Sequence, residues 1–323
     1  MTRRGLALRR TSALLLPSIL AAALCAGCLN AGPEVQSVEA SVGAASGGPA
    51  ETSKENMSDA EGMPEATTIG ASQIEGDLAG ATDASSGVPF VAKTQASGGS
   101  SYDADTVLAV RYEVNEDYER AVIDLGTGLE PAGPVPEWSL GSQDGKGLLR
   151  VTLPSASATC VSDGEFGDGL LESFHVVRAP EGGIFMDIFT RERFLSRVVE
   201  LKDPARLLVD FKPKGDLKAP LPAEGGDTVL VEPRPGAKIS DTLTVNGYSR
   251  NSEAAITIIL LDSNGKVLVR RTVLSNDTSH TWGYFEATLD LPSFSGKADL
   301  KVGTESAHNS SFEGTKIPVW ASQ

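Results

Sequence analysis

The three cysteines are the residues of this chain best suited to covalent chemistry, because a thiolate is a strong nucleophile. Cys25 and Cys28 stand close together at the end of an apolar run that begins after Arg10, whereas Cys160 stands far along the chain. Two arrangements fit these positions. In the first, the run is a buried strand and Cys25 or Cys28 is disulfide-bonded to Cys160. In the second, the run never folds with the rest of the chain, and one of its sulfurs is chemically modified.

The residues that flank the run favour the second arrangement. Residues 1–28 contain four arginines and no acidic residue. The apolar stretch "TSALLLPSILAAAL" is broken by Pro17, and it is about half as long as a membrane-spanning helix. The small residues Ala26 and Gly27 come directly before Cys28. A basic start, a short apolar core and a small-residue cut site are typical of a secretory signal peptide.

The Ala-Gly-Cys ending resembles the bacterial lipobox, in which the cysteine after the cut receives a thioether-linked diacylglycerol. We predict a lipoprotein signal peptide over residues 1–27, lipidation of Cys28, and a chain that is exported and lipid-anchored to the extracytoplasmic face of the cell membrane. The alternative is an ordinary signal peptide that is cut elsewhere, and either Sec or twin-arginine export fits the basic start. Cleavage and lipidation would leave Cys160 without a disulfide partner.

The remaining residue types show no pattern of an active site. His175, His280 and His308 stand singly, without the spacing of a metal site, and no Gly-x-Ser-x-Gly sequence marks an activated serine. We therefore predict no catalytic residue, no metal site and no cofactor. Because the members of a Ser-His-Asp triad need not be adjacent in sequence, the alternative is an enzyme of cell-wall metabolism with an unrecognised active site in residues 103–213.

Two short stretches have the composition of binding sites. The acidic loop "SDGEFGDG" (162–169) places carboxylates between glycines, but it lacks the closing glutamate of a calcium loop, so we favour a solvated loop over a cation site. The stretch "SHTWGYFEA" (279–287) places Trp282 and Tyr284 at the start of an expected strand. These two rings are candidates for stacking on the sugar rings of a glycan, and packing in the core is the alternative.

The charge balance bears on the class of partner. The formal net charge is −15, and no segment carries a cluster of Lys and Arg. Nucleic acid is therefore an improbable partner, because its phosphates require such a cluster. Docking of the protein surface on anionic lipid is improbable for the same reason. The sequence predicts that the membrane is reached through the acyl chains of the lipid anchor.

The chain divides into a polar part and a strand-rich part. Residues 28–102 are rich in Ala, Gly, Ser, Thr and Glu, which predicts a lipidated cysteine followed by a disordered acidic tether. After that point, short apolar runs alternate with Gly, Pro and Asp, and no helical period holds for a useful length. We predict an all-β fold with two β-sandwich domains, 103–213 and 228–323, joined by a Pro- and Gly-rich linker at 214–227. The expected strands cover residues 106–114, 119–125, 147–153, 170–179, 183–190, 196–201, 206–211, 241–249, 254–262, 266–274, 284–291, 298–303 and 315–320.

The two strand-rich halves resemble two families. "YERAVIDL" and "RFLSRVVELKDPARLLVDF" are similar to the AMIN-like domain of actinobacterial lipoproteins, a distant relative of the amidase N-terminal domain. The features carried over are Asp203, Pro204, Arg206 and Asp210, which we interpret as structural. The second half, from "VEPRPGAKISDTLTVNGYS" to "FEGTKIPV", resembles the immunoglobulin-like domain associated with bacterial spore germination.

These resemblances imply extracytoplasmic β-sandwiches without an established catalytic residue, and the first implies proximity to peptidoglycan. The predicted function is accordingly that of a non-catalytic envelope lipoprotein. It would present two β-sandwich modules that bind peptidoglycan, another wall polymer or an envelope protein partner.

Overall fold

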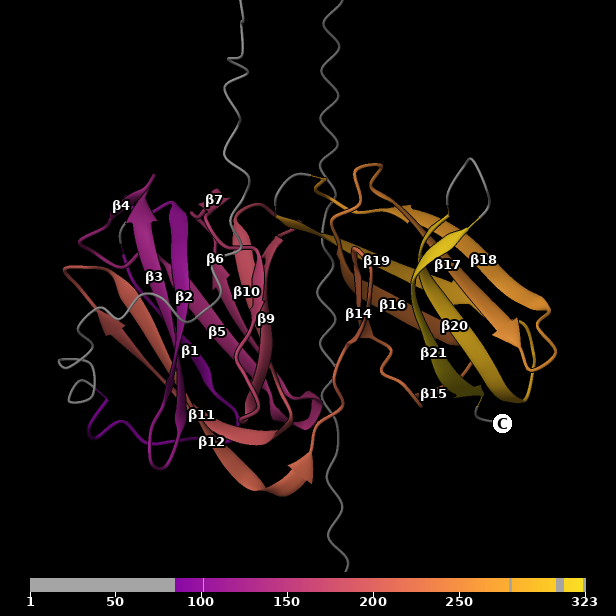
Figure 1. The fold of residues 1–323 in the computed structure, drawn as a ribbon, viewed down its shortest axis with the longest axis horizontal. Helices are drawn as coiled ribbons and strands as arrows, with labels where there is room; N and C mark the ends of the chain where they lie inside the picture. Colours follow the sequence, from indigo (N-terminus) through magenta and orange to yellow (C-terminus); the bar gives the residue numbers. More distant parts are fainter. Residues whose placement is uncertain (1–84, 101, 279–280, 306–310, 322–323) are drawn as a thin grey trace, which may run out of the picture. The chain divides into compact units, whose positions relative to one another are not determined.

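Residues 85–100, 102–278, 281–305 and 311–321 are described by a computed structural model of the chain, and they form three β-sheets (Figure 1). The predicted all-β fold is confirmed, and the short 3-10 turn η1 (Asp144–Lys146) is the one helical element among the described residues. In that part of the chain, no helix is long and apolar enough to cross a membrane. The predicted signal peptide, Cys28, most of the predicted tether, His280 and His308 lie outside the described residues.

The first sandwich is formed by two layers that are antiparallel apart from the parallel pair β2-β7. One layer is the six-stranded sheet in the order β11-β12-β3-β2-β7, with β4 paired to β3. The other layer is the first part of a ten-stranded sheet, in the order β1-β5-β6-β10-β9, with β8 paired to β9. The strands of these layers are β1 (Gln95–Gly98), β2 (Thr106–Val114), β3 (Glu119–Thr127), β4 (Glu130–Pro131), β5 (Trp138–Gln143), β6 (Leu148–Leu153), β7 (Ala158–Thr159), β8 (Asp163–Glu165), β9 (Leu171–Arg178), β10 (Ile184–Thr190), β11 (Glu192–Leu201) and β12 (Arg206–Lys218).

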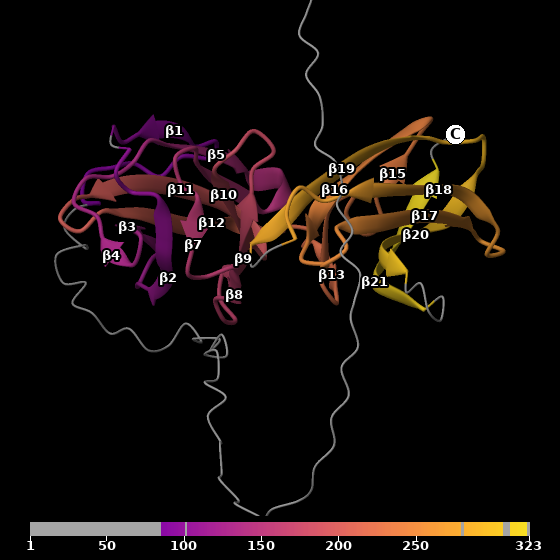
Figure 2. The ribbon, with the colours of Figure 1, turned by 90° about the horizontal axis from the view of Figure 1, so that it is seen from above.

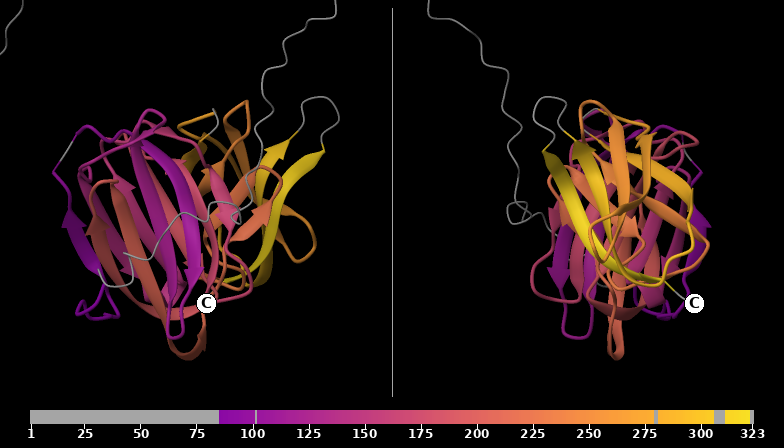
Figure 3. Two further views of the ribbon diagram at one scale, coloured as in Figure 1. Left: turned by 60° about the vertical axis from the view of Figure 1, so that its left-hand side comes forward. Right: turned by 90° about the vertical axis from the view of Figure 1, so that its right-hand side faces the viewer.

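The second sandwich has the same two-layer construction. Strands β19-β16-β14-β13 continue the ten-stranded sheet, and the facing layer is a five-stranded sheet in the order β15-β21-β20-β17-β18. The right-hand view of Figure 3 shows the yellow strands β20 and β21 side by side. The strands are β13 (Ala223–Gly225), β14 (Thr228–Glu232), β15 (Lys238–Ile239), β16 (Thr242–Ser249), β17 (Ala255–Asp262), β18 (Val267–Leu274), β19 (Trp282–Asp290), β20 (Gly296–Glu305) and β21 (Phe312–Ala321).

Each sandwich has its own apolar core, because alternate residues of each strand point between its two layers. The first core includes Ile123, Val151 and Phe211, and the second includes Val245 and Leu300. The Asn264-Gly265 turn closes the hairpin of β17 and β18, with Gly265 at φ 80°. All thirteen expected strands correspond to observed ones, with end-points that shift by up to seven residues, the largest shift being at the end of β12.

The expectation of a disordered tether up to residue 102 is corrected at its C-terminal end. Residues 95–98 form β1, which lies beside β5 (Figure 2) and pairs with it through Gln95–Gly141 and Ser97–Ser139. An isolated bridge also joins Val91 to Ser196. The order of this segment comes from backbone hydrogen bonds to a sheet edge. Such bonds leave no apolar period in the sequence, so the polar composition gives no sign of the strand.

The predicted linker also contains regular structure. Residues 214–218 are the end of β12, and residues 223–225 are β13, which pairs with β14. At the junction of the two sandwiches, Trp282 and Gly283 of β19 pair in parallel with Val177 and Arg178 of β9. A third apolar cluster contains residues of both sandwiches, including Phe189 and Tyr248.

Candidate functional site

A polar groove lies on the outer face of the first sandwich, over β1, β5 and β6. Ala96, Leu140 and Val151 of these strands pack in the core, so their sequence neighbours face outward. The outward residues enclose a volume of about 590 Å³. The polar residues that line it are Gln95, Ser97, Ser139, Ser142, Gln143, Arg150 and Thr152.

The hollow follows from a glycine in the middle of this face. Gly141 lies between Gln95 on one neighbouring strand and Arg150 on the other. A Cβ atom placed at Gly141 would meet no heavy atom within 4 Å. The floor of the groove is therefore bare backbone, flanked by amide, hydroxyl and guanidinium groups.

One end of the groove is fixed by a buried carboxylate. Arg150 donates from Nε to Oδ1 of Asp187 and from Nη2 to Oδ2, both at 2.7 Å, and its guanidinium lies 3.8 Å from the centre of the Phe185 ring. Asp187 is fully buried and also accepts a hydrogen bond from the hydroxyl of Tyr248, in the second sandwich. Burial lowers the pKa of Arg150, but the hydrogen bonds and charge of Asp187 outweigh it and raise that pKa. The pair is held rigidly and carries no net charge.

The other end of the groove opens onto an exposed tyrosine. Ser97 also lines a second hollow of about 370 Å³, together with Gly99, Tyr102 and Trp138. Oε1 of Glu200 accepts hydrogen bonds from the Gly99 amide and from Nε1 of Trp138, both at 2.6 Å, which fixes this wall. Tyr102 is 77% exposed, so its ring is available to a ligand. Tyr102 falls within the predicted tether, and no sequence signal connects it with Gly141.

The glycan-stacking hypothesis for Trp282 is wrong. Trp282 is 3% exposed, and its Nε1 donates to Oδ1 of Asp163 at 3.2 Å. Arg250 lies 4.2 Å from its ring centre, and the His175 ring packs edge-on at 5.2 Å. The ring is buried because β19 begins at the junction of the two sandwiches, a contact that alternation within one strand does not predict.

Tyr284 is half-buried and is engaged within the protein. Its hydroxyl donates to Oε2 of Glu286 at 2.5 Å, and its ring packs edge-on against Phe185 at 6.1 Å. Because Phe185 also packs against Arg150, Tyr284 belongs to the support of the groove rather than to its lining.

His175 is a buried packing residue of β9. It is 3% exposed and contacts the rings of Phe189, Tyr248 and Trp282. Burial lowers the pKa of His175 to about 4, so the imidazole is neutral at pH 7. Its Nδ1 makes no hydrogen bond, and its Nε2 lies 3.8 Å from Oε1 of Glu224. This arrangement lacks the hydrogen bond that would pair a histidine with a nucleophile.

The acidic loop is part of the sandwich junction. Oδ1 of Asp163 accepts from Nη1 of Arg250 at 2.9 Å, as well as from Trp282. Asp163 and Glu165 belong to β8, which pairs with β9. Within the described residues, no three His, Cys, Asp or Glu side chains are grouped as metal ligands. Cys160 is exposed and unpaired.

The residues of the AMIN-like pattern occupy two places. Asp203, Pro204 and Arg206 lie at the turn from β11 to β12, where the Asp203 amide donates to the carbonyl of Gly133 at 3.0 Å. Asp210 lies on β12 and is 1% exposed. It accepts hydrogen bonds from two arginines, as described next.

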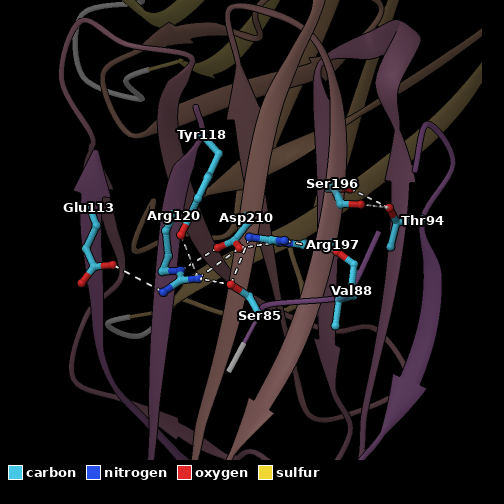
Figure 4. A network of polar contacts seen from close by, with 9 residues as sticks. All are labelled: Ser85, Val88, Thr94, Glu113, Tyr118, Arg120, Ser196, Arg197 and Asp210. Carbon is cyan, nitrogen blue, oxygen red and sulfur yellow. Dashed lines mark hydrogen bonds and ion pairs between the residues drawn. The ribbon is translucent and has the colours of Figure 1, made fainter. Parts of the chain in front are cut away.

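Figure 4 shows the network around Asp210. Its Oδ1 accepts from Nε of the fully buried Arg120 at 2.6 Å, and its Oδ2 accepts from Nε of Arg197 at 2.7 Å. Ser85 Oγ accepts from Nη2 of Arg120 at 2.8 Å and from Nη2 of Arg197 at 3.0 Å. These bonds fasten the segment that leads into β1, and so they position one wall of the groove.

Comparison with known proteins supports the identity of the second sandwich. Residues 229–311 match the family described as the immunoglobulin-like domain of bacterial spore germination. The match confirms the predicted resemblance of this half of the chain and indicates a non-catalytic binding module there. No curated protein and no solved structure matches the chain.

Proposed function

We propose that this chain is a non-catalytic cell-envelope lipoprotein whose first sandwich binds a glycan of the cell wall, peptidoglycan above all. The groove around Gly141 is the observation that carries the proposal. It offers amide and hydroxyl groups over bare backbone, beside the fixed Arg150, and it leads to the exposed ring of Tyr102.

This lining fits a saccharide better than a nucleic acid or an apolar ligand. Sugar hydroxyls and acetamido groups pair with Ser, Thr and Gln side chains, and a tyrosine ring can stack on a sugar face. The pairing of Arg150 with Asp187 leaves no excess positive charge to attract phosphates. The second sandwich would serve as the module that contacts an envelope protein partner.

The rest of the chain would bring this groove to the wall. We infer that residues 103–213 are an AMIN-like domain, that Cys28 carries the lipid anchor, and that the polar segment between Cys28 and β1 acts as the tether.

A blocked groove tests the proposal. In Gly141→Trp, an indole would fill the hollow without displacing backbone, because the site is open and the backbone of Gly141 is not left-handed. We expect the full chain to be retained on purified peptidoglycan and the variant to lose at least tenfold in affinity. Gly145→Trp is the matched control, since it adds the same side chain at an equally open glycine outside the groove.

Tyr102→Ala provides a second variant that alters the exposed ring and leaves the groove floor unchanged. Equal retention of the wild type, Gly141→Trp and Gly145→Trp would contradict the proposal. Release of soluble wall fragments by the wild type would instead favour the alternative of a wall-metabolising enzyme with its active site in residues 103–213.

A further inference from the structure

The outer face of the five-stranded sheet gathers lysines that are far apart in the sequence. Alternate residues of β20, from Ala298 to Val302, point into the core of the second sandwich, so Lys297 and Lys301 face outward. The same alternation applies to β15 and β21. We call this outer surface the lysine face, and its members are Lys238, Lys297, Asp299, Lys301, Phe312, Lys316 and Trp320.

The register of the strands places like charges side by side. Lys301 lies directly opposite Lys316. On its other side Ile259 separates it from Arg270, which is ion-paired with Glu305 of β20. Like charges that face each other across two strands destabilise a sheet. The close approach of Lys301 and Lys316 therefore has a cost in the isolated protein that Asp299 offsets in part and a negatively charged partner would offset further.

The carboxylate of Asp299 interacts with three lysines on this face. Oδ2 of Asp299 lies 2.7 Å from Nζ of Lys316, and its Oδ1 lies 4.0 Å from Nζ of Lys297. The hydrogen bond of Lys316, together with the charges of Lys316, Lys297 and Lys301, lowers the pKa of Asp299. With Asp299 ionised, the three lysines retain a local excess of positive charge, on a chain whose formal net charge is −15.

The lysine face also carries exposed aromatic surface. Trp320 is 47% exposed and lies between Lys238 on β15 and Lys297 on β20. Phe312 also lies on this face, and Nζ of Lys301 is 5.3 Å from the centre of its ring. Tryptophan is favoured where an apolar environment meets water, and a lysine stem can cover apolar surface while its ammonium group stays in a polar layer.

We propose that the lysine face docks on the surface of an anionic lipid bilayer, with the lysines at the headgroup phosphates and Trp320 in the interfacial layer. A soluble polyanion would satisfy the lysines and leave the indole exposed, whereas a bilayer interface satisfies both. This proposal is independent of the groove on the first sandwich. It reverses the expectation that no part of the protein surface docks on lipid, because distant lysines become neighbours only in the sheet.

The position of Trp320 allows a direct test. The chain has three tryptophans, and Trp138 and Trp282 are 4% and 3% exposed, so Trp320 is the one that external agents reach. The full chain is reconstituted in vesicles of phosphatidylcholine, or of phosphatidylcholine with phosphatidylglycerol, each with brominated acyl chains. The N-terminal region is present in both experiments. We expect the bromine atoms to quench the fluorescence of Trp320 on the anionic vesicles only, and added salt should weaken this quenching. The variant Trp320→Phe shows which part of the fluorescence comes from Trp320.

Charge variants locate the contact. The double variant Lys297→Gln, Lys316→Gln removes two lysines whose side chains are each 53% exposed. The ratio of docked to undocked protein should fall about fivefold for each lysine removed. Lys93→Gln with Lys202→Gln is the control, because it removes the same charge from exposed sites on the first sandwich. Equal quenching on both kinds of vesicle, equal loss in both double variants, or no quenching would overturn the proposal. So would binding of soluble inorganic polyphosphate without quenching on anionic vesicles.

Discussion

Asp210 shows how one side chain fixes a distant part of the groove. It accepts hydrogen bonds from Arg120 and Arg197, and both arginines also donate a hydrogen bond to Oγ of Ser85. The same two arginines contact aromatic residues of neighbouring segments, including Phe90, whose ring centre lies 4.3 Å from Arg197. Asp210 is 1% exposed, so it acts by holding the segment that leads into β1 and not by contacting a ligand.

Loss of the Asp210 carboxylate should destabilise the protein strongly. In Asp210→Asn the fully buried Arg120 would keep its charge with only Glu113, 3.7 Å from its Nη1, as a counter-ion, and breaking a buried pair costs about 3–5 kcal/mol. Urea unfolding of the full chain measures the change. The control is Lys212→Ala, which removes an exposed pair with Asp117 and should cost about 0–1 kcal/mol. Similar changes in both variants would refute the assigned role.

Strands β9, β10 and β19 form the element that joins the two sandwiches. A row of facing residues runs across the sheet from Gln95 and Gly141 in the groove, through Arg150 and Asp187, to His175 at the junction. The hydroxyl of Tyr248 reaches Asp187 from the second sandwich. The groove and the junction are therefore neighbouring parts of one sheet, and packing at the junction supports Arg150.

The buried His175 should make the stability of this junction depend on pH. Its pKa is lowered from 6.5 to about 4, with burial as the main cause, partly opposed by the charges of Asp163 and Asp187. The unfolded chain therefore binds a proton at a higher pH than the folded chain does. Stability from this group is complete above about pH 6.5 and is lost as the pH falls towards 4, by at most about 1.4 kcal/mol per pH unit.

Unfolding of the wild type and His175→Leu at pH 7, 6 and 5 isolates this contribution. Other groups that titrate in this range are common to both proteins, so the difference in slope belongs to His175. We expect the variant to lose less stability than the wild type between pH 6.5 and 5. Parallel curves would show that the histidine is not neutral in the fold.

At the scale of the whole molecule, two surfaces with different chemistry lie on different sheets. The groove lies on the ten-stranded sheet and is polar without net charge, whereas the lysine face lies on the five-stranded sheet and is positive. The chain as a whole is acidic. Partners of the two surfaces therefore need not compete, and each can be removed by substitution without altering the other.

The predicted lipid anchor at Cys28 belongs to this scale because it would decide where both surfaces act. Metabolic labelling with a fatty-acid analogue should mark the wild type and leave Cys28→Ala unmarked, since the thioether requires the sulfur of Cys28. Cys160→Ala is the control, because it removes the exposed cysteine of the folded part and should remain labelled. Equal labelling of wild type and Cys28→Ala would refute lipidation at Cys28.

The sequence by itself determined the all-β class, most strands and the type of the second sandwich. These follow from local signals: period-2 alternation from residues 106 to 320, the Asn264-Gly265 turn and a family pattern that runs through nearly a whole domain. Local signals do not predict that Trp282 is buried, that residues 95–98 form strand β1, or that strand β13 lies within the predicted linker. The first two depend on pairing with residues distant in the chain, whereas β13 is a short polar partner of the adjacent β14 without an apolar period.

Both candidate surfaces were decided by the tertiary structure. Gly141 forms a hollow only because Gln95 and Arg150 are its neighbours across strands, and Lys301 meets Lys316 only through the register of β20 and β21. Counting charges along the sequence suggested no basic surface, because the lysines are interspersed with acids in sequence. A sheet sorts residues by face and by register, and it is this sorting that places charges of one sign together.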